Sequence, residues 1–523
     1  MRLKLPAILA AVIVGAYVNA QGPANSPARV VEAAAQALGG KDRLLAIKTL
    51  TIIGYGQLAY QNGGGNIVGS PDAPQKWINL NGSVRTIDFD RRRMRLQETQ
   101  THDFVFAYER NMRGVTIDQR LDADVAFNIG ANGRAVLAGA GAARARRLEM
   151  LNNPIAIVRA ALEPQSKLTN LRTERNTQVL DLTTGTGDAL TVAFDSDTHL
   201  PAWVSAIEPN ANLGDVTVRT SFVGYQKVDG GGVMMPAGYN SVMDFRNVVQ
   251  RKLYVDRTVV DGPIEDLAAP ADVRAATPLP PAAPSIEVVP VAKGIWYLKG
   301  GGNSTAFEFN DHITLFEAYA SEANAKAIIA KARTLVPGKP VTELIVSHHH
   351  FDHSGGLRAA VSEGLRVITQ RGNTELFREM TSRPAVVFPD ALGRNPKPIT
   401  IVPVDDMLVL KDSAMEVVVY RAINNTHMAN GVFAYAPAAR VIAQGDLVDA
   451  AWDIVWWGNS YPDSVTSWKL AVDRDLPVHG DIHTYPEVLQ YLRKQAADAV
   501  ALCDTVQAAG MTMPGCPATN VGF

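Results

Sequence analysis

The sequence is poor in cysteine, in surplus charge and in long apolar stretches. Only two of its 523 residues are cysteine, and the formal net charge is −2. Proteins that bind nucleic acid generally have a basic face and a high pI, so this near-neutral balance argues against a nucleic-acid partner. After residue 20, no stretch offers the ~20 apolar residues that a membrane-spanning helix needs. We therefore expect a globular chain with no transmembrane segment once its N-terminal segment is removed.

The N-terminal segment has the layout of a secretory signal peptide. Arg2 and Lys4 precede a short apolar run, and Val18 and Ala20 occupy the small-residue positions of a cleavage site. The sequence predicts a signal peptide over residues 1–20 and a periplasmic or secreted product. An uncleaved anchor helix is the alternative.

The two cysteines, Cys503 and Cys516, both lie near the C-terminal end of the chain. In an oxidising compartment two nearby cysteines tend to pair. Gly510 and Pro514 allow the segment between them to turn back, so we predict a disulfide. The alternative is two unrelated small apolar residues.

The pattern of the chain changes at several points, which predicts two domains joined by a linker. The first domain is β-rich, with alternating strands, a helical interlude over 144–162 and the character of a curved open sheet. It contains no evident catalytic constellation. A proline- and alanine-rich stretch favours extended backbone and marks the linker. Strands and helices then alternate, which indicates α/β layering. The predicted segments are 24–265 (β-rich domain), 266–286 (linker), 287–500 (α/β domain) and 501–523 (C-terminal tail).

Metal-ligating side chains are concentrated in the stretch SHHHFDHSGG, which lies between a short apolar strand and a helix. Its pattern is H-x-H-x-D-H, filled by His348, His350, Asp352 and His353, with His349 as a spacer. Ligand sites of α/β folds lie at the carboxyl ends of strands, where this stretch falls. Closely spaced histidines suit borderline-soft divalent metals, zinc first among them. A solvated polar loop is the alternative.

One loop cannot supply the ligands for two metal ions, so further ligands are expected from later loops. His427, Asp446 and His479 each follow or separate predicted strands, and two of them adjoin a glycine. Each would be weak evidence alone. Their order and their positions at strand ends make them strong candidates together.

With these residues in place, segment 287–500 resembles the metallo-β-lactamase fold superfamily. The resemblance implies an αββα sandwich with a dinuclear metal site at its edge. It implies that one ion is held by His348, His350 and His427. It implies that the other ion is held by Asp352, His353 and His479, and that Asp446 bridges the two. Many members have an early aspartate behind the histidine loop. Here Glu317 stands at that position, where it can make the same supporting hydrogen bonds.

The function that follows from this resemblance is that of a metal-dependent hydrolase. Two zinc ions would generate hydroxide at neutral pH, Asp352 would orient it, and a small ester, lactone, amide or related molecule would be the substrate. Three alternatives stay open: a β-lactamase-type activity, an iron-dependent redox member of the fold, and a non-catalytic periplasmic binding protein. The sequence does not indicate the oligomeric state.

Three tryptophans follow Asp446 closely, namely Trp452, Trp456 and Trp457. They are candidates for a wall of the substrate pocket. A packing role beneath the next helix is an equally good interpretation, because buried aromatic side chains mostly serve packing.

Overall fold

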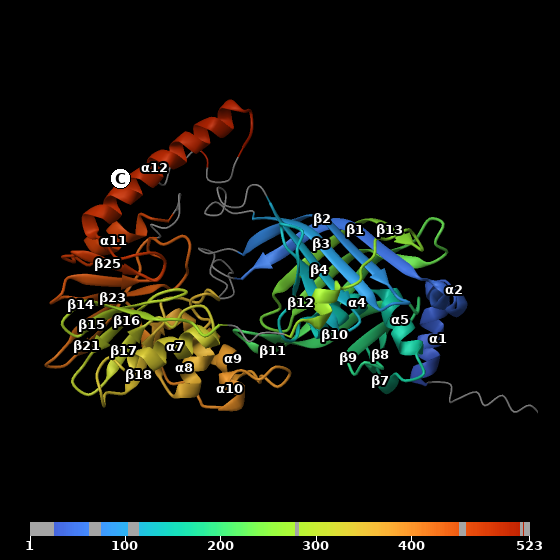
Figure 1. Cartoon of the computed structure of the whole chain (residues 1–523), viewed down its shortest axis with the longest axis horizontal. Helices are drawn as coiled ribbons and strands as arrows, with labels where there is room; N and C mark the ends of the chain where they lie inside the picture. Colours follow the sequence, from blue (N-terminus) through green and yellow to red (C-terminus); the bar gives the residue numbers. More distant parts are fainter. Residues whose placement is uncertain are drawn as a thin grey trace, which may run out of the picture.

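The computed structural model describes residues 26–61, 75–102, 114–277, 282–448, 457–512 and 516. The predicted signal peptide over 1–20 lies outside these residues. Among the described residues, no helix combines the length and apolar character needed to cross a bilayer. Figure 1 shows two lobes side by side, one formed by the first half of the chain and the other by the second.

A single antiparallel sheet of 13 strands forms the first lobe. Consecutive strands pair with each other along most of its length, and the last strand, β13, pairs with β1 in the middle of the sheet. The strands are β1 (Thr49–Tyr60), β2 (Lys76–Asp88), β3 (Arg93–His102), β4 (Val115–Asp122), β5 (Val125–Ile129), β6 (Ala135–Leu137), β7 (Lys167–Glu174), β8 (Thr177–Thr183), β9 (Ala189–Asp195), β10 (Pro201–Asn210), β11 (Gly214–Lys227), β12 (Met234–Met243) and β13 (Val249–Val260).

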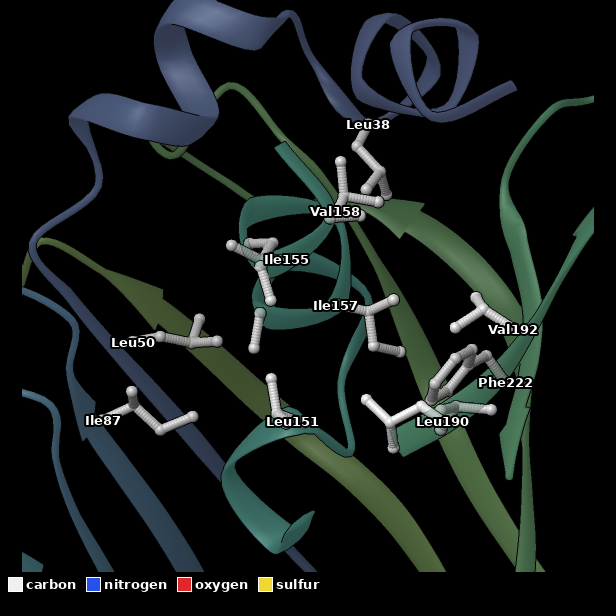
Figure 2. Close-up of a cluster of buried hydrophobic side chains, with 14 of the residues drawn as sticks. Leu38, Leu50, Ile87, Leu151, Ile155, Ile157, Val158, Leu190, Val192 and Phe222 are labelled. Carbon is white, nitrogen blue, oxygen red and sulfur yellow. The ribbon is translucent and has the colours of Figure 1, made fainter. Parts of the chain in front are cut away.

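Helices α1 (Pro27–Leu38), α2 (Lys41–Ala46), α4 (Ala142–Leu151) and α5 (Pro154–Leu162) pack against one side of this sheet. Helix α5 is apolar on nearly every side, and most of its residues are buried, as expected for a helix at the centre of a core. Figure 2 shows its Ile155, Ile157 and Val158 between side chains of the sheet, including Leu50 and Leu190. The β-rich first domain predicted from the sequence is therefore present.

The predicted helical interlude over 144–162 is present and consists of two helices, α4 and α5. The Asn153 side chain accepts a hydrogen bond from the Ala156 amide at 2.9 Å, which caps the start of α5. Pro154 follows at the first helical position, where its missing N–H is not needed. The chain therefore ends one helix and begins another at this point.

The predicted linker, 266–286, is not extended along its length. It contains a short helix, α6 (Ala271–Ala275), whose Val273 is buried against Phe127 of the first sheet. The Ala269 amide donates to the Asp122 carboxylate at 2.8 Å. This segment is therefore attached to the first lobe, because its apolar and polar groups both find partners there.

The second lobe contains two sheets that face each other across an apolar core. One has seven strands: β14 (Glu287–Ala292), β15 (Ile295–Lys299), β16 (Ser304–Glu308), β17 (Ile313–Phe316), β18 (Val341–Ile345), β19 (Arg366–Gln370) and β20 (Ile401–Val404). The other has six: β21 (Met407–Lys411), β22 (Glu416–Arg421), β23 (Val432–Ala436), β24 (Val441–Gln444), β25 (Arg474–Pro477) and β26 (His483–Thr484).

Helices cover the outer faces of both sheets. On the seven-stranded sheet, apolar side chains of α7 (Glu322–Ala332), α8 (Leu357–Glu363), α9 (Thr374–Ser382) and α10 (Ala391–Arg394) share one buried cluster with the strands. On the six-stranded sheet, α11 (Ser460–Ser467) and α12 (Tyr485–Ala508) do the same. Helix α12 continues across residue 500, where the sequence had suggested the start of a tail. The predicted disulfide between Cys503, on this helix, and Cys516 is present.

The two lobes share an apolar cluster, so they are packed together rather than loosely tethered. Leu213 and Phe245 of the first lobe are fully buried in the same cluster as Leu357 and Phe377 of α8 and α9. The Asp215 carboxylate accepts hydrogen bonds from two backbone amides of the second lobe, at 2.7 and 3.1 Å. These contacts hold the end of the first sheet, at β11, beside α8 and α9 (Figure 1).

Candidate metal centre

Four loops of the second lobe meet at one edge of the two sheets, and each follows a strand. The stretch from His348 to His353 follows β18, and His427 lies between β22 and β23. Asp446 comes just after β24, and His479 just after β25. Strands β24 and β25 are parallel, as are β17, β18 and β19, so their carboxyl ends meet at the same edge. Loop ends of this kind are the usual place for a ligand site.

The structure brings all seven predicted ligand residues together in two adjoining clusters. In each cluster, one nitrogen or carboxylate oxygen per residue lies within 4.8 Å of the others. The clusters are His348, His350, His427 and Asp446; and Asp352, His353 and His479. The spacer His349 is in neither cluster, although its side chain is buried.

In the first cluster, the ring nitrogens converge on a single carboxylate oxygen. Nε2 of His348 lies 2.8 Å from Nδ1 of His350. Oδ2 of Asp446 lies 2.9 Å from Nε2 of His427 and 3.4 Å from Nε2 of His348. Three imidazoles and one carboxylate oxygen therefore surround one small volume.

The second cluster uses the other oxygen of the same carboxylate. Oδ1 of Asp446 lies 3.2 Å from Nε2 of His353 and 3.4 Å from Nε2 of His479. Oδ2 of Asp352 is 3.7 and 3.9 Å from those two nitrogens. Asp446 thus stands between the clusters, with one oxygen toward each.

Burial keeps the imidazoles of the first cluster neutral. It lowers the pKa of His427 to about 4. Burial, with the neighbouring imidazoles, lowers the pKa of His350 well below its ordinary value and that of His348 in the same direction. Neutral imidazole is the form that binds metal, so these residues need not lose a proton to do so.

His353 has the opposite character, because carboxylates surround it. Burial alone would lower its pKa, but Asp446 and Asp352 outweigh that effect and hold the pKa of His353 well above its ordinary value. The pKa of Asp446 is well below normal despite its burial, because His353 and its other imidazole neighbours favour the carboxylate. The second cluster therefore concentrates negative charge that a cation would neutralise.

Glu317 supports the histidine loop from behind. Its side chain is fully buried, and Oε1 accepts a hydrogen bond from the Ser347 amide at 2.6 Å. Oε2 lies 3.8 Å from Nδ1 of His353, on the side of the ring away from Asp446. The φ of Glu317 is 64°, a conformation that is uncommon outside glycine and that clusters at functional sites. These are the contacts expected of the supporting role suggested by the sequence.

The residues fit a pair of divalent cations. Oδ1 of Asp446 is buried, and within the described part of the chain it accepts no hydrogen bond of normal geometry. A buried carboxylate oxygen left in this state is costly unless a cation or a donor reaches it. Five imidazoles and two carboxylates in two adjoining sets are the donor types that zinc and similar metals prefer.

Of the three predicted pocket tryptophans, the structure describes one. The ring of Trp457 stacks on the ring of His427, with centroids 4.0 Å apart and planes 15° apart, and Trp457 is buried. It therefore packs against a candidate ligand rather than forming an open wall. Trp452 and Trp456 lie outside the described residues.

Sequence reasoning missed three residues near the clusters. The Tyr319 ring lies edge-on to His353 and His479, and its hydroxyl donates to Asp352 at 3.4 Å. Its place two residues after Glu317 was an available signal. Tyr60 and Lys76 come from the first lobe, and both are coupled electrostatically to Asp446. No motif marks them, so the sequence offered no signal for either.

Comparisons with known proteins agree with this geometry. Residues 299–473 match the model of the metallo-beta-lactamase superfamily. A linear primary-alkylsulfatase of a Pseudomonas species is 37% identical over 75 residues, which is 14% of this chain and 11% of that relative. The chain therefore spans only a small part of the sulfatase's length.

Two solved structures are among those that match part of the chain. The metallo-beta-lactamase of Pontibacter korlensis is 15% identical and covers 40% of this chain and 99% of its own, with a TM-score of 0.32. The metallo-beta-lactamase of Hirschia baltica is 15% identical and covers 39% of this chain and 95% of its own, with a TM-score of 0.29. With the family match and the two His/Asp clusters, the C-terminal lobe of this chain is a member of the metallo-beta-lactamase superfamily.

Proposed function

We propose that the protein is an exported hydrolase in which two zinc ions occupy the two clusters. The observation that carries this proposal is the position of Asp446, which directs one carboxylate oxygen toward each cluster. His348, His350 and His427 would hold one ion. The second ion would be held by the other cluster of three residues, Asp352, His353 and His479, with Asp446 bridging.

Two zinc ions held in this way supply a hydroxide at neutral pH and a Lewis acid for the electrophilic atom of the substrate. The chain's own residues do the rest. Asp352 accepts a hydrogen bond from the Tyr319 hydroxyl. Its carboxylate would also accept a hydrogen bond from the nucleophile and so orient it. Glu317 fixes the His353 ring through Nδ1, so that Nε2 faces the site. Trp457 excludes water from one face of His427.

The substrate we propose is a small ester, lactone, amide or related compound. The short match to an alkylsulfatase adds sulfate esters to this group and makes them the first compounds to test. Hydroxide attack on any of these releases an acid and an alcohol or amine, so one site can serve all of them.

We further propose that the protein works in the periplasm or outside the cell. The first twenty residues have the order of a signal peptide, with basic residues, a short apolar run and small residues at the cleavage site. The disulfide between Cys503 and Cys516 is also typical of exported proteins.

A substrate panel on zinc-loaded protein tests this proposal. The panel contains an aryl acetate, a lactone, a β-lactam, a phosphodiester and an alkyl sulfate. We expect at least one to be hydrolysed, the activity to vanish with a strong chelator, and zinc to restore it. His350→Ala should abolish the reaction. His199→Asn, which replaces an exposed histidine of the first lobe, should leave it unchanged. Full activity in chelated protein would refute the proposal.

A further inference from the structure

The first lobe contains a cavity of about 380 Å³. Its lining comes from the turn between β2 and β3, the end of β4, helices α4 and α5, and the loop between β8 and β9. Small-molecule sites in proteins typically have volumes of ~300–1,000 Å³. The cavity is therefore large enough to hold a small ligand.

This cavity is separate from the metal clusters. Phe89, in its lining, donates its backbone amide to the carbonyl of Lys48, just before β1, at 2.9 Å. At the other end of β1, the carbonyl of Gln61 accepts a hydrogen bond from the Phe351 amide of the histidine loop at 3.4 Å. Strand β1 has 12 residues, so its two ends are about 35–40 Å apart at ~3.3 Å per residue. In Figure 1, helix α5 accordingly lies beside α1 and α2, away from the second lobe.

Part of the lining is apolar. Leu121, Leu151, Ala156 and Ala160 line the cavity and belong to the buried core around α5. The half-buried Met150 lines it as well and packs against the same core. Covering apolar surface of this kind is favourable by ~25 cal/mol per Å². The cavity therefore favours a ligand with an apolar body.

The charged part of the lining has a surplus of positive charge. Arg92, Arg147 and Arg159 line the cavity together with Glu163 and Asp188, which leaves a balance of one positive charge. Nε of Arg147 lies 2.7 Å from Oδ2 of Asp188, so these two charges compensate each other. Glu163 is exposed, and water screens its charge. Arg92 and Arg159 are therefore the cations available to a ligand.

Arg159 is the one charged residue of α5, and it is half-buried. Its guanidinium lies 4.5 Å from the centre of the Phe89 ring, and Nη1 donates to the carbonyl of Leu44. That hydrogen bond uses one of the five N–H groups of a guanidinium. Burial lowers the pKa of Arg159, and more distant carboxylates of the chain only partly offset this effect. The Arg159 side chain thus has both the charge and the donors to bind an anion.

We propose that the cavity binds a small amphipathic anion, whose anionic group pairs with Arg159 and Arg92 and whose apolar body lies on the core side chains. A water molecule takes up ~30 Å³ in the liquid, so the cavity has room for about a dozen groups of that size, which suits a chain of about ten carbon atoms with its head group. The inference goes beyond the proposed hydrolase, because the metal clusters take no part in it.

Ligand binding to the full-length protein tests the site without relying on catalysis. The probes are decanoate, decanesulfonate, decanol and decyltrimethylammonium, each titrated by calorimetry below its micelle concentration. The two anions distinguish a carboxylate from a sulfonate head group, and neither contains an ester bond. The variants are Arg159→Met, Arg92→Met and Met150→Trp. Arg257→Met is the matched control, because it removes an exposed arginine of the same sheet, on β13.

We expect the wild type to bind at least one of the anions, to bind decanol at least tenfold more weakly and to bind the cationic probe not at all. Arg159→Met should weaken anion binding at least tenfold and leave decanol within about threefold. Arg92→Met should weaken anion binding about threefold to tenfold, because Arg92 is exposed. Met150→Trp, which fills the cavity, should weaken binding of every probe. Arg257→Met should match the wild type.

Several results would overturn the proposal. These are a wild type that binds no anion, decanol that binds as tightly as the anions, and anion affinity that is unchanged in both arginine variants. Thermal unfolding is recorded for every protein, and if Arg159→Met does not fold, Arg92→Met and Met150→Trp decide the test. The titrations are repeated after zinc removal, which should leave the anion affinity unchanged. An anion whose binding disappears with zinc is bound at the metal clusters, which would also overturn the proposal.

Discussion

Replacing Glu317 by glutamine tests how the histidine loop is supported. The amide keeps an oxygen to accept from the Ser347 N–H, which is 2.6 Å from Oε1 in the wild type. It loses the negative charge 3.8 Å from Nδ1 of His353 and can turn an N–H toward that ring instead. We therefore expect Glu317→Gln to fold normally but to bind metal more weakly at the second cluster.

The magnitude follows from these contacts. Loss of a carboxylate behind a metal-binding histidine lowers metal affinity by about 10- to 100-fold, or about 1.4–2.8 kcal/mol. Glu317→Ala should lose this and also leave the Ser347 amide buried without an acceptor, which costs about 1–3 kcal/mol of folding stability. The glutamine variant should thus show a metal defect, and the alanine variant a metal defect together with lower stability.

The assay is zinc competition against a chromophoric chelator, combined with urea unfolding of the metal-free proteins. Glu287→Gln serves as the control, since Glu287 is an exposed carboxylate of the same lobe. Unchanged zinc affinity in Glu317→Gln, or a stability loss as large as that of the alanine variant, would show that this reasoning about Glu317 is wrong.

Three further predictions concern other parts of the chain. A Cβ at Gly445 would lie 3.4 Å from Nδ1 of His348 and would overlap the serine hydroxyl beside it, so Gly445→Ala should weaken zinc binding at least tenfold in the competition assay. Burial, with a neighbouring carboxylate, raises the pKa of Glu208 from 4.5 to about 7. The contribution of the Glu208 side chain to folding stability is therefore fully present below pH 4.5 and is lost as the pH rises through 7. A glutamine there should stabilise the protein at pH 8, but not at pH 4, by about 1–2 kcal/mol in urea unfolding. The Cys503–Cys516 disulfide joins residues that are 13 positions apart, so breaking it should remove up to ~3 kcal/mol of local stability. We expect faster amide hydrogen exchange at the end of α12 and unchanged hydrolysis.

Most of the second lobe could be predicted because its signals are local. The H-x-H-x-D-H pattern, and a histidine or aspartate just after each of several short buried strands, are readable without the fold. The seven residues that these signals select do lie together. The strand-end rule explains this, because side chains that follow neighbouring strands meet at one edge of a sheet.

The remainder depends on contacts between distant parts of the chain. Lys76 and Tyr60 belong to the first lobe, which is held on the second by the burial of Leu213 and Phe245 against α8 and α9. Nothing near either residue in the sequence encodes that docking. The short helix within the predicted linker depends on a contact of the same kind, since Val273 packs against an apolar partner on the first sheet that composition alone does not reveal.

Two metal sites that share Asp446 should differ in their response to the loss of one ligand, and the zinc content of variants measures this response. Zinc per chain is measured by elemental analysis after exhaustive dialysis, for the wild type, His479→Ala and Asp446→Ala. We expect two zinc ions in the wild type and one in His479→Ala, because only the second cluster loses a ligand there. We expect less than one in Asp446→Ala, because both clusters lose a ligand. A wild type that holds no zinc, or an Asp446→Ala variant that still holds two ions, would contradict this expectation.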